Sequence, residues 1–163
     1  MRVAVSATSS QSGASNSTPA RGVRGLFVVI AVLALAGMAV SAVSLQRHYA
    51  KSSSAFCDFG KKFNCDVVNR SEYSSLMGIP VAGIGIAGYG VLFALATIYR
   101  SRVETPLRLL LTAVAGFAFA LYLTYVEGYV LDTWCILCLS SLALISMITA
   151  LAGILKLQAA RTK

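Results

Sequence analysis

The sequence is poor in charged residues, and this scarcity excludes an ordinary water-soluble domain. Asp and Glu occur only 6 times in 163 residues, all charged residues make up 12%, and hydrophobic residues make up 57%. A soluble domain usually has about 25% charged residues, because polar side chains must cover much of its surface. The mean hydropathy is +0.75. We therefore expect a polytopic membrane protein.

Four stretches contain no charged residue over a length that suits a membrane helix, which needs about 20 residues. They cover residues 26–45, 78–99, 109–126 and 133–155, and the third extends to 107 when the preceding turn is included. None alternates in polarity as a barrel strand does. The sequence predicts an all-α integral membrane protein whose four-transmembrane-helix bundle occupies residues 24–157. Residues 1–23 and 158–163 are expected to be cytoplasmic tails, the first of them disordered.

Helix-start signals accompany three of these stretches. Pro80 and Pro106 fall where the second and third helices should begin, positions at which the missing N–H costs little. Asp132 and Thr133 are candidate caps for the fourth helix. The longest connection is the loop 46–77.

Charge placement predicts the orientation. If the N-terminus is cytoplasmic, that side carries the whole net charge of +8 and the opposite side sums to zero. This asymmetry follows the positive-inside rule and argues against a nucleic-acid partner. Cleavage of the first stretch as a secretory signal after Ala42 is an alternative, although the apolar run exceeds the usual 7–15 residues of a signal core.

All four cysteines are expected on the extracytoplasmic side. Cys57 and Cys65 lie in the long loop, and Cys135 and Cys138 form a C-x-x-C motif at the start of the fourth helix. A helix N-terminus stabilises a thiolate, so this pair is typical of a thiol–disulfide exchanger. Two structural disulfides are the alternative. A zinc site is a weaker one, because only one of the two spacings suits zinc ligands.

Aromatic spacing in the loop predicts a short amphipathic helix. Phe56, Phe59 and Phe63 recur at intervals of three and four residues and would share one face. Such a helix would lie flat at the membrane surface and carry Cys57 above the mouth of the bundle.

Together these features resemble the vitamin K epoxide reductase family. The resemblance rests on the loop pair Cys57 and Cys65, on Ser71 six residues later, on Gly-Ile-Pro at 78–80, and on the Cys135/Cys138 motif. It implies a quinone held in the bundle beside Cys138, with Ser71, Pro80 and Val81 in its vicinity, and no metal. The quinone would be of the menaquinone, ubiquinone or phylloquinone type. Where vertebrate members have a Tyr that holds the quinone, this chain has Leu142.

The resemblance also implies a reaction and a location. We expect an enzyme of the bacterial inner membrane that reoxidises a periplasmic thioredoxin-fold, DsbA-like thiol oxidase and passes the electrons to a membrane quinone. Electrons would pass from the pair Cys57 and Cys65 to Cys135 and then to Cys138. The alternatives are a vitamin K quinone or epoxide reductase and a non-enzymatic membrane protein with structural disulfides.

The expected orientation can be tested by labelling. A cysteine introduced at Ser10 or Thr162 should resist an impermeant thiol reagent added to intact cells, whereas a cysteine at Asn64 should react. Labelling of the termini with protection of the loop position would reverse the orientation.

Overall fold

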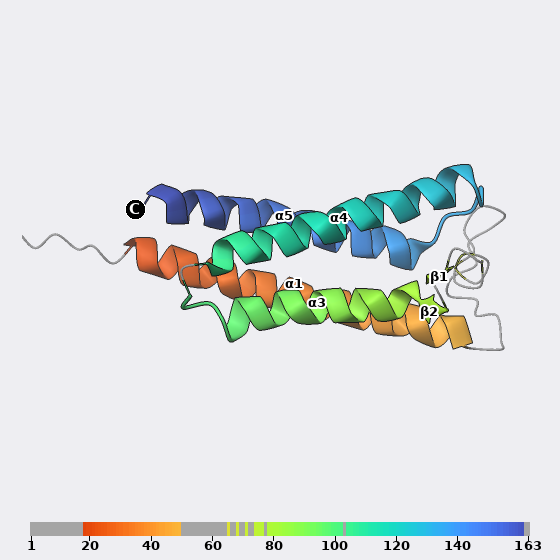
Figure 1. Ribbon diagram of the computed structural model, residues 1–163, viewed down its shortest axis with the longest axis horizontal. Coiled ribbons are helices and arrows are strands. Elements are labelled where there is room, and N and C mark those ends of the chain that lie inside the picture. The colour runs from red at the N-terminus through yellow and green to blue at the C-terminus, as the bar shows by residue number, and fades with distance from the viewer. Residues whose placement is uncertain are drawn as a thin grey trace, which may run out of the picture.

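The structure is a computed structural model that describes residues 18–49, 65, 68, 71, 74–76, 78–102 and 104–161. Within these residues it contains four helices and one small hairpin (Figure 1). The helices lie lengthwise beside one another, and the hairpin lies at the end where α5 begins. The elements are α1 (Thr18–Tyr49), β1 (Ser75–Leu76), β2 (Ile79–Pro80), α3 (Val81–Thr97), α4 (Thr105–Tyr129) and α5 (Ile136–Arg161).

The core of the bundle comes from one face of each helix. The most extensive contact joins α1 to α3, and α5 packs against both α4 and α1. Buried side chains recur every three or four residues, which is the spacing that brings side chains to one face of a helix. The core residues are Phe27, Ile30, Ala31, Ala34, Tyr89, Leu92, Ala96, Leu109, Ala113, Ile145, Ile148, Ala152 and Leu155.

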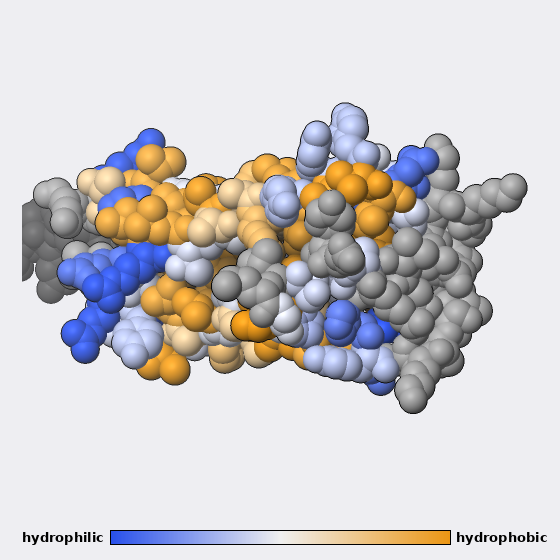
Figure 2. Space-filling view, turned by 45° about the vertical axis from the view of Figure 1, so that its right-hand side comes forward, coloured by the Kyte–Doolittle hydropathy of each residue, from blue (hydrophilic) through white to orange (hydrophobic). Residues whose placement is uncertain are grey.

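The outer surface suits lipid. Three helices are long and apolar enough to cross a membrane, at Gly22–Tyr49, Thr105–Tyr129 and Ile136–Arg161, while α3 is apolar but has only 17 residues. Large apolar side chains such as Val32, Leu111 and Met147 are exposed, and hydrophobic side chains cover much of the middle of the molecule in Figure 2. Three helices could thus cross a membrane, as expected for a multi-pass membrane protein, and a fourth crossing by α3 stays a prediction.

The first and last helices extend further toward the two chain termini than the sequence predicts. Residues 18–23, expected in a disordered tail, belong to α1, and α5 continues to Arg161 through most of the expected second tail. Pro19 explains the first extension, because proline fits the first turn of a helix. The charge-free run marks where lipid can surround a helix, not where its backbone hydrogen bonds end. Since α1 supplies Phe27, Ile30 and Ala34 to the core, cleavage after Ala42 would remove part of that core.

The second predicted helix begins later than expected. Residues 75–80 form an antiparallel hairpin in which Ser75 pairs with Pro80 and Leu76 with Ile79. Gly78 turns the chain with φ 84°, a conformation that glycine adopts without steric cost. Pro80 is extended with ψ 130°, so it precedes α3 instead of lying in its first turn. Only Pro106 falls where predicted, at the start of α4.

The predicted caps of the fourth helix are also wrong. The helix α5 begins at Ile136, so Asp132 and Thr133 lie too far upstream to cap it. Asp132 has a positive φ of 45°, and the Thr133 hydroxyl donates to the Leu131 carbonyl. The short amphipathic helix expected around Phe59, and Cys57 with it, lie outside the described residues.

The contact between α1 and α3 depends on a missing side chain. A Cβ atom at Gly37 would overlap the ring of Tyr89, and that ring is held by hydrogen bonds from its hydroxyl to Ser141. We expect Gly37→Ala to lower the free energy of unfolding by about 1–3 kcal/mol, the usual cost of overpacking.

Thermal unfolding in detergent measures this effect. Gly25→Ala is the matched control in the same helix, because nothing lies within 4 Å of a Cβ atom there. Equal midpoints for the two variants would contradict the close packing of α1 on α3.

Candidate redox site

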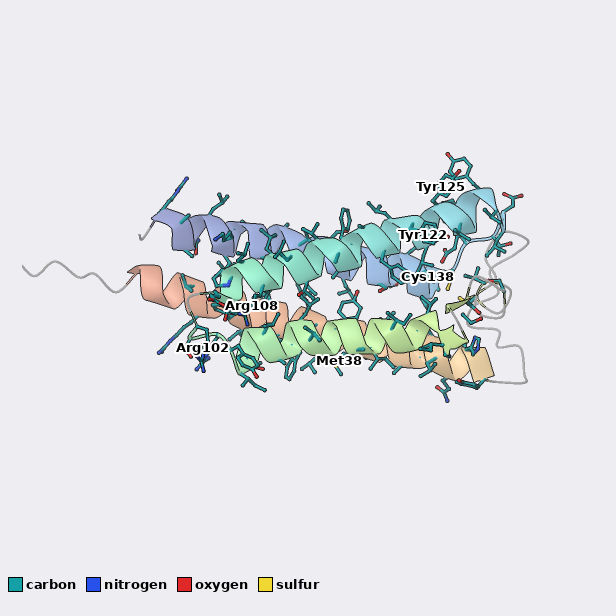
Figure 3. All side chains as sticks on the ribbon, viewed as in Figure 1. Met38, Arg102, Arg108, Tyr122, Tyr125 and Cys138 are labelled. Atoms are coloured by element: carbon teal, nitrogen blue, oxygen red, sulfur yellow. The ribbon has the colours of Figure 1, made fainter. Side chains whose placement is uncertain are left out.

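Three of the four cysteines meet at one end of the bundle. Cys135 directly precedes α5 and is fully buried, and Cys65 of the loop is 1% exposed. With Val68 they form a small cluster of their own, against which Cys138 packs. None of these three cysteines is joined to another by a disulfide. Figure 3 shows Cys138 on the first turn of α5, close to the hairpin.

The thiols form a hydrogen-bonded series. Cys65 interacts with Cys135 through a side-chain hydrogen bond, and Cys135 interacts with Cys138 in the same way. The bond with Cys138 raises the pKa of Cys135, the bond with Cys65 lowers that pKa, and burial adds to the rise. The pKa of Cys135 ends above its ordinary value. The hydrogen bond with Cys138 and burial thus oppose the thiolate stabilisation that a helix N-terminus gives to such a pair.

A cavity of about 330 Å³ opens beside this cluster. Cys138, Ser71, Pro80 and Val81, the residues predicted near the quinone, all line it, whereas Cys65 and Cys135 do not. Most of the wall is aliphatic or aromatic, contributed by all four helices, with a few polar groups among them. The polar or ionisable side chains of the wall are Ser41, Ser44, His48, Ser71, Ser74, Tyr89, Glu127, Cys138 and Ser141.

Two polar groups of the wall were not predicted as site residues. His48 contacts Ser74, with its Nδ1 atom 3.4 Å from the Ser74 hydroxyl oxygen. Tyr89 donates to the Ser141 carbonyl at 2.9 Å. In the sequence, only their unusual surroundings could have indicated a role in the site. His48 is the single histidine, and Tyr89 stands among small and aliphatic residues of α3.

Glu127 is a further site residue that the sequence did not predict. The charge-free run ends at Val126, so this carboxylate was expected outside the membrane span. It lies instead in the last turns of α4 and is 2% exposed. Its Oε2 atom accepts a hydrogen bond from the backbone N–H of Cys135 at 3.1 Å.

The cysteines and the carboxylate lie close to one another. One carboxylate oxygen of Glu127 and the Sγ atoms of Cys135 and Cys138 are mutually within 4.8 Å. Such a set has metal-binding atoms, but close thiols beside a carboxylate are equally what thiol–disulfide chemistry uses. The cluster by itself therefore does not define a metal centre.

The family model for the vitamin K epoxide reductase family matches residues 28–153, which is more than half of the chain. The chain belongs to the vitamin K epoxide reductase family. The resemblance inferred from the cysteine pattern is confirmed, and with it the general activity, because members of this family are membrane oxidoreductases linked to quinones and thiols. A search of curated proteins found no match.

The arrangement predicts which disulfide can be trapped. In Cys138→Ala, we expect a disulfide between Cys65 and Cys135, because these sulfurs lie together in the buried cluster. Peptide mapping of the protein without reductant would identify it. Cys135→Ala should give far less of a disulfide between Cys65 and Cys138. A higher yield in Cys135→Ala would show that Cys138 is the partner of the loop.

Proposed function

We propose that this protein is a thiol:quinone oxidoreductase that reoxidises a periplasmic, DsbA-like thiol oxidase. One observation supports this proposal above the others. Cys138 faces the cavity, whereas Cys135 faces Cys65. Two cysteines of one C-x-x-C motif thus have different neighbours, as they must if electrons enter at one sulfur and leave from the other.

The thiol steps need only the cysteines of this chain and the partner. A thiolate of the reduced partner attacks Cys57 of the loop disulfide and releases Cys65 as a thiolate. Cys65 then attacks Cys135 of the Cys135–Cys138 disulfide, which forms a Cys65–Cys135 disulfide and leaves both electrons of the broken bond on Cys138. The second thiol of the partner then attacks the mixed disulfide with Cys57 and releases Cys57 as a thiolate. Cys57 attacks Cys65 of the Cys65–Cys135 disulfide, which restores the loop disulfide and frees Cys135. Each step breaks one S–S bond and forms another.

The cavity fits a quinone ring by its size and by its lining. An apolar wall with a few placed polar groups is what small-molecule sites commonly have. A bound quinone supplies a two-electron acceptor next to Cys138. Since this chain has Leu142 where vertebrate relatives use a Tyr, we assign the binding of the two quinone oxygens to His48 and Tyr89, the ring-bearing polar residues of the wall.

The membrane arrangement that we propose keeps the four crossings and the orientation inferred from charge. The helix α3 packs along α1, and its 17 residues fall at the lower limit for crossing the hydrocarbon core. Arg102 and Arg108 lie at the end opposite Cys138 (Figure 3). Cys138 would then be near the periplasmic surface of a bacterial inner membrane, within reach of a soluble thiol partner.

The proposal is tested by separating the two thiol pairs. Cys57→Ala and Cys65→Ala should lose oxidation of a reduced thioredoxin-fold protein but keep quinone reduction driven by a small permeable dithiol, because the Cys135–Cys138 pair is intact and Cys138 lines the cavity. Cys135→Ala and Cys138→Ala should lose both reactions. Quinone reduction is followed by absorbance and the protein partner by thiol labelling.

Two results would contradict the proposal. Loop variants that are active in both assays would make the pair Cys57 and Cys65 structural. A Cys138→Ala protein that still reduces quinone would remove Cys138 from the reaction. If all four variants match the wild type and the wild type turns over neither substrate, the cysteines form static disulfides.

A further inference from the structure

Glu127 is a buried carboxyl group with no salt-bridge partner among the described residues. Its side chain is 2% exposed. Among the described residues, the cavity wall includes no Lys or Arg, and Glu127 is its one carboxyl group. A buried carboxylate is costly unless it is paired or holds a proton. Glu127 must therefore share a proton with a neighbouring group.

Its two oxygens have different surroundings. Oε2 accepts from the Cys135 backbone at 3.1 Å. Oε1 is buried and has no hydrogen-bond partner among the described residues. The Cys138 side chain interacts with the carboxylate, and a carboxylate oxygen lies within 4.8 Å of its Sγ atom. Oε2 thus accepts a hydrogen bond from the backbone, while Oε1 is still able to accept a proton.

The thiol series ends at this carboxylate. Hydrogen bonds link Cys65 to Cys135 and Cys135 to Cys138, and the Glu127 carboxylate lies within 4.8 Å of the Cys138 Sγ atom. The other titratable groups on the wall are His48 of α1 and Tyr89 of α3, and the structure pairs them with Ser74 and Ser141. In the part of the chain that the structure describes, Glu127 is the titratable group other than a cysteine that lies beside the cysteine pair.

We propose that Glu127 exchanges a proton with Cys138 during the thiol cycle. This inference rests on the proposed function and assigns a proton acceptor to the same site. As Cys65 attacks Cys135, the Cys135–Cys138 bond breaks and Cys138 leaves with the electron pair. The carboxylic acid of Glu127 gives its proton to that sulfur, so the products are the Cys65–Cys135 disulfide, a Cys138 thiol and a Glu127 carboxylate. The single negative charge that entered on Cys65 ends on Glu127.

The return of the proton prepares Cys138 to donate electrons. The carboxylate takes the thiol proton back, and Cys138 becomes the thiolate that can act as a reductant. Once the Cys135–Cys138 bond has broken, Cys138 and Glu127 hold one proton and one negative charge between them. This avoids placing two anions side by side in a low-dielectric site.

Glu127→Gln separates proton exchange from positioning. A Gln side chain still offers an oxygen to the Cys135 N–H but accepts no proton, whereas Glu127→Ala removes both capacities. Glu104→Gln is the control, because this carboxylate flanks the other end of α4, where it is exposed and paired with Arg108.

The experiment measures Cys138 alone. In a full-length chain with Cys57, Cys65 and Cys135 replaced by Ala, Cys138 is alkylated with a small uncharged reagent at a series of pH values. With Glu127 present, the rate should show a plateau over the pH range in which Glu127 and Cys138 share one proton, because a constant fraction of the pair then has the proton on the carboxylate and a thiolate on Cys138. Below that range both groups are protonated and the rate should fall again. With Glu127→Gln, the rate should fall about tenfold per pH unit throughout. The Glu104→Gln profile should match the parent.

A plateau in both proteins, or in neither, overturns the proposal. A second measurement on the wild-type chain does not depend on variants that fold poorly. The infrared difference spectrum between the oxidised and reduced protein should show a carboxylic acid band that shifts when Glu is isotopically labelled. Absence of that band also overturns the proposal. Failure of the proposed function would appear separately, as quinone reduction that survives Cys138→Ala.

Discussion

The hydrogen bond between the Cys135 N–H and the Glu127 carboxylate organises the redox end of the molecule. Asp132 and Thr133 do not cap α5, so the backbone before this helix needs another acceptor. Because Cys135 is fully buried, leaving its N–H without a partner would cost about 1–3 kcal/mol. Glu127 supplies the acceptor from the end of α4 and thereby ties α4 to α5. With Cys135 held against Cys65, Cys138 is directed into the cavity one helical turn deeper.

Much of the architecture could be predicted because lipid imposes simple requirements. A membrane-crossing backbone must satisfy its own hydrogen bonds, so long runs without charge mark the helices, and their core faces follow from helical periodicity. Ser71, Pro80 and Val81 could be assigned to the cavity only through the family pattern. Nothing in the residues themselves distinguishes Val81 from the other aliphatic side chains of α3.

The remaining features depend on contacts between distant parts of the chain. Glu127 was placed outside the span because an unpaired carboxylate is unfavourable in lipid, and only the tertiary structure supplies its contacts with Cys135 and Cys138. The hairpin at 75–80 replaces the first helical turn because Gly78 adopts a positive φ, a choice that hydropathy does not reveal. The proximity of Gly37 to Tyr89 likewise depends on how α1 and α3 are aligned.

The cavity wall includes residues of both α3 and α4, and the contact between these two helices is less extensive than those that join α1 to α3, α4 to α5 and α1 to α5. The boundary between α3 and α4 is thus the least extensive helix contact around the cavity, and in the proposed four-span arrangement it would face the hydrocarbon of the bilayer. A lipophilic substrate that arrives through this boundary never has to dissolve in water. Its effective concentration is then set by its mole fraction in the bilayer, so an apparent Michaelis constant expressed per litre of buffer would vary with the amount of lipid present.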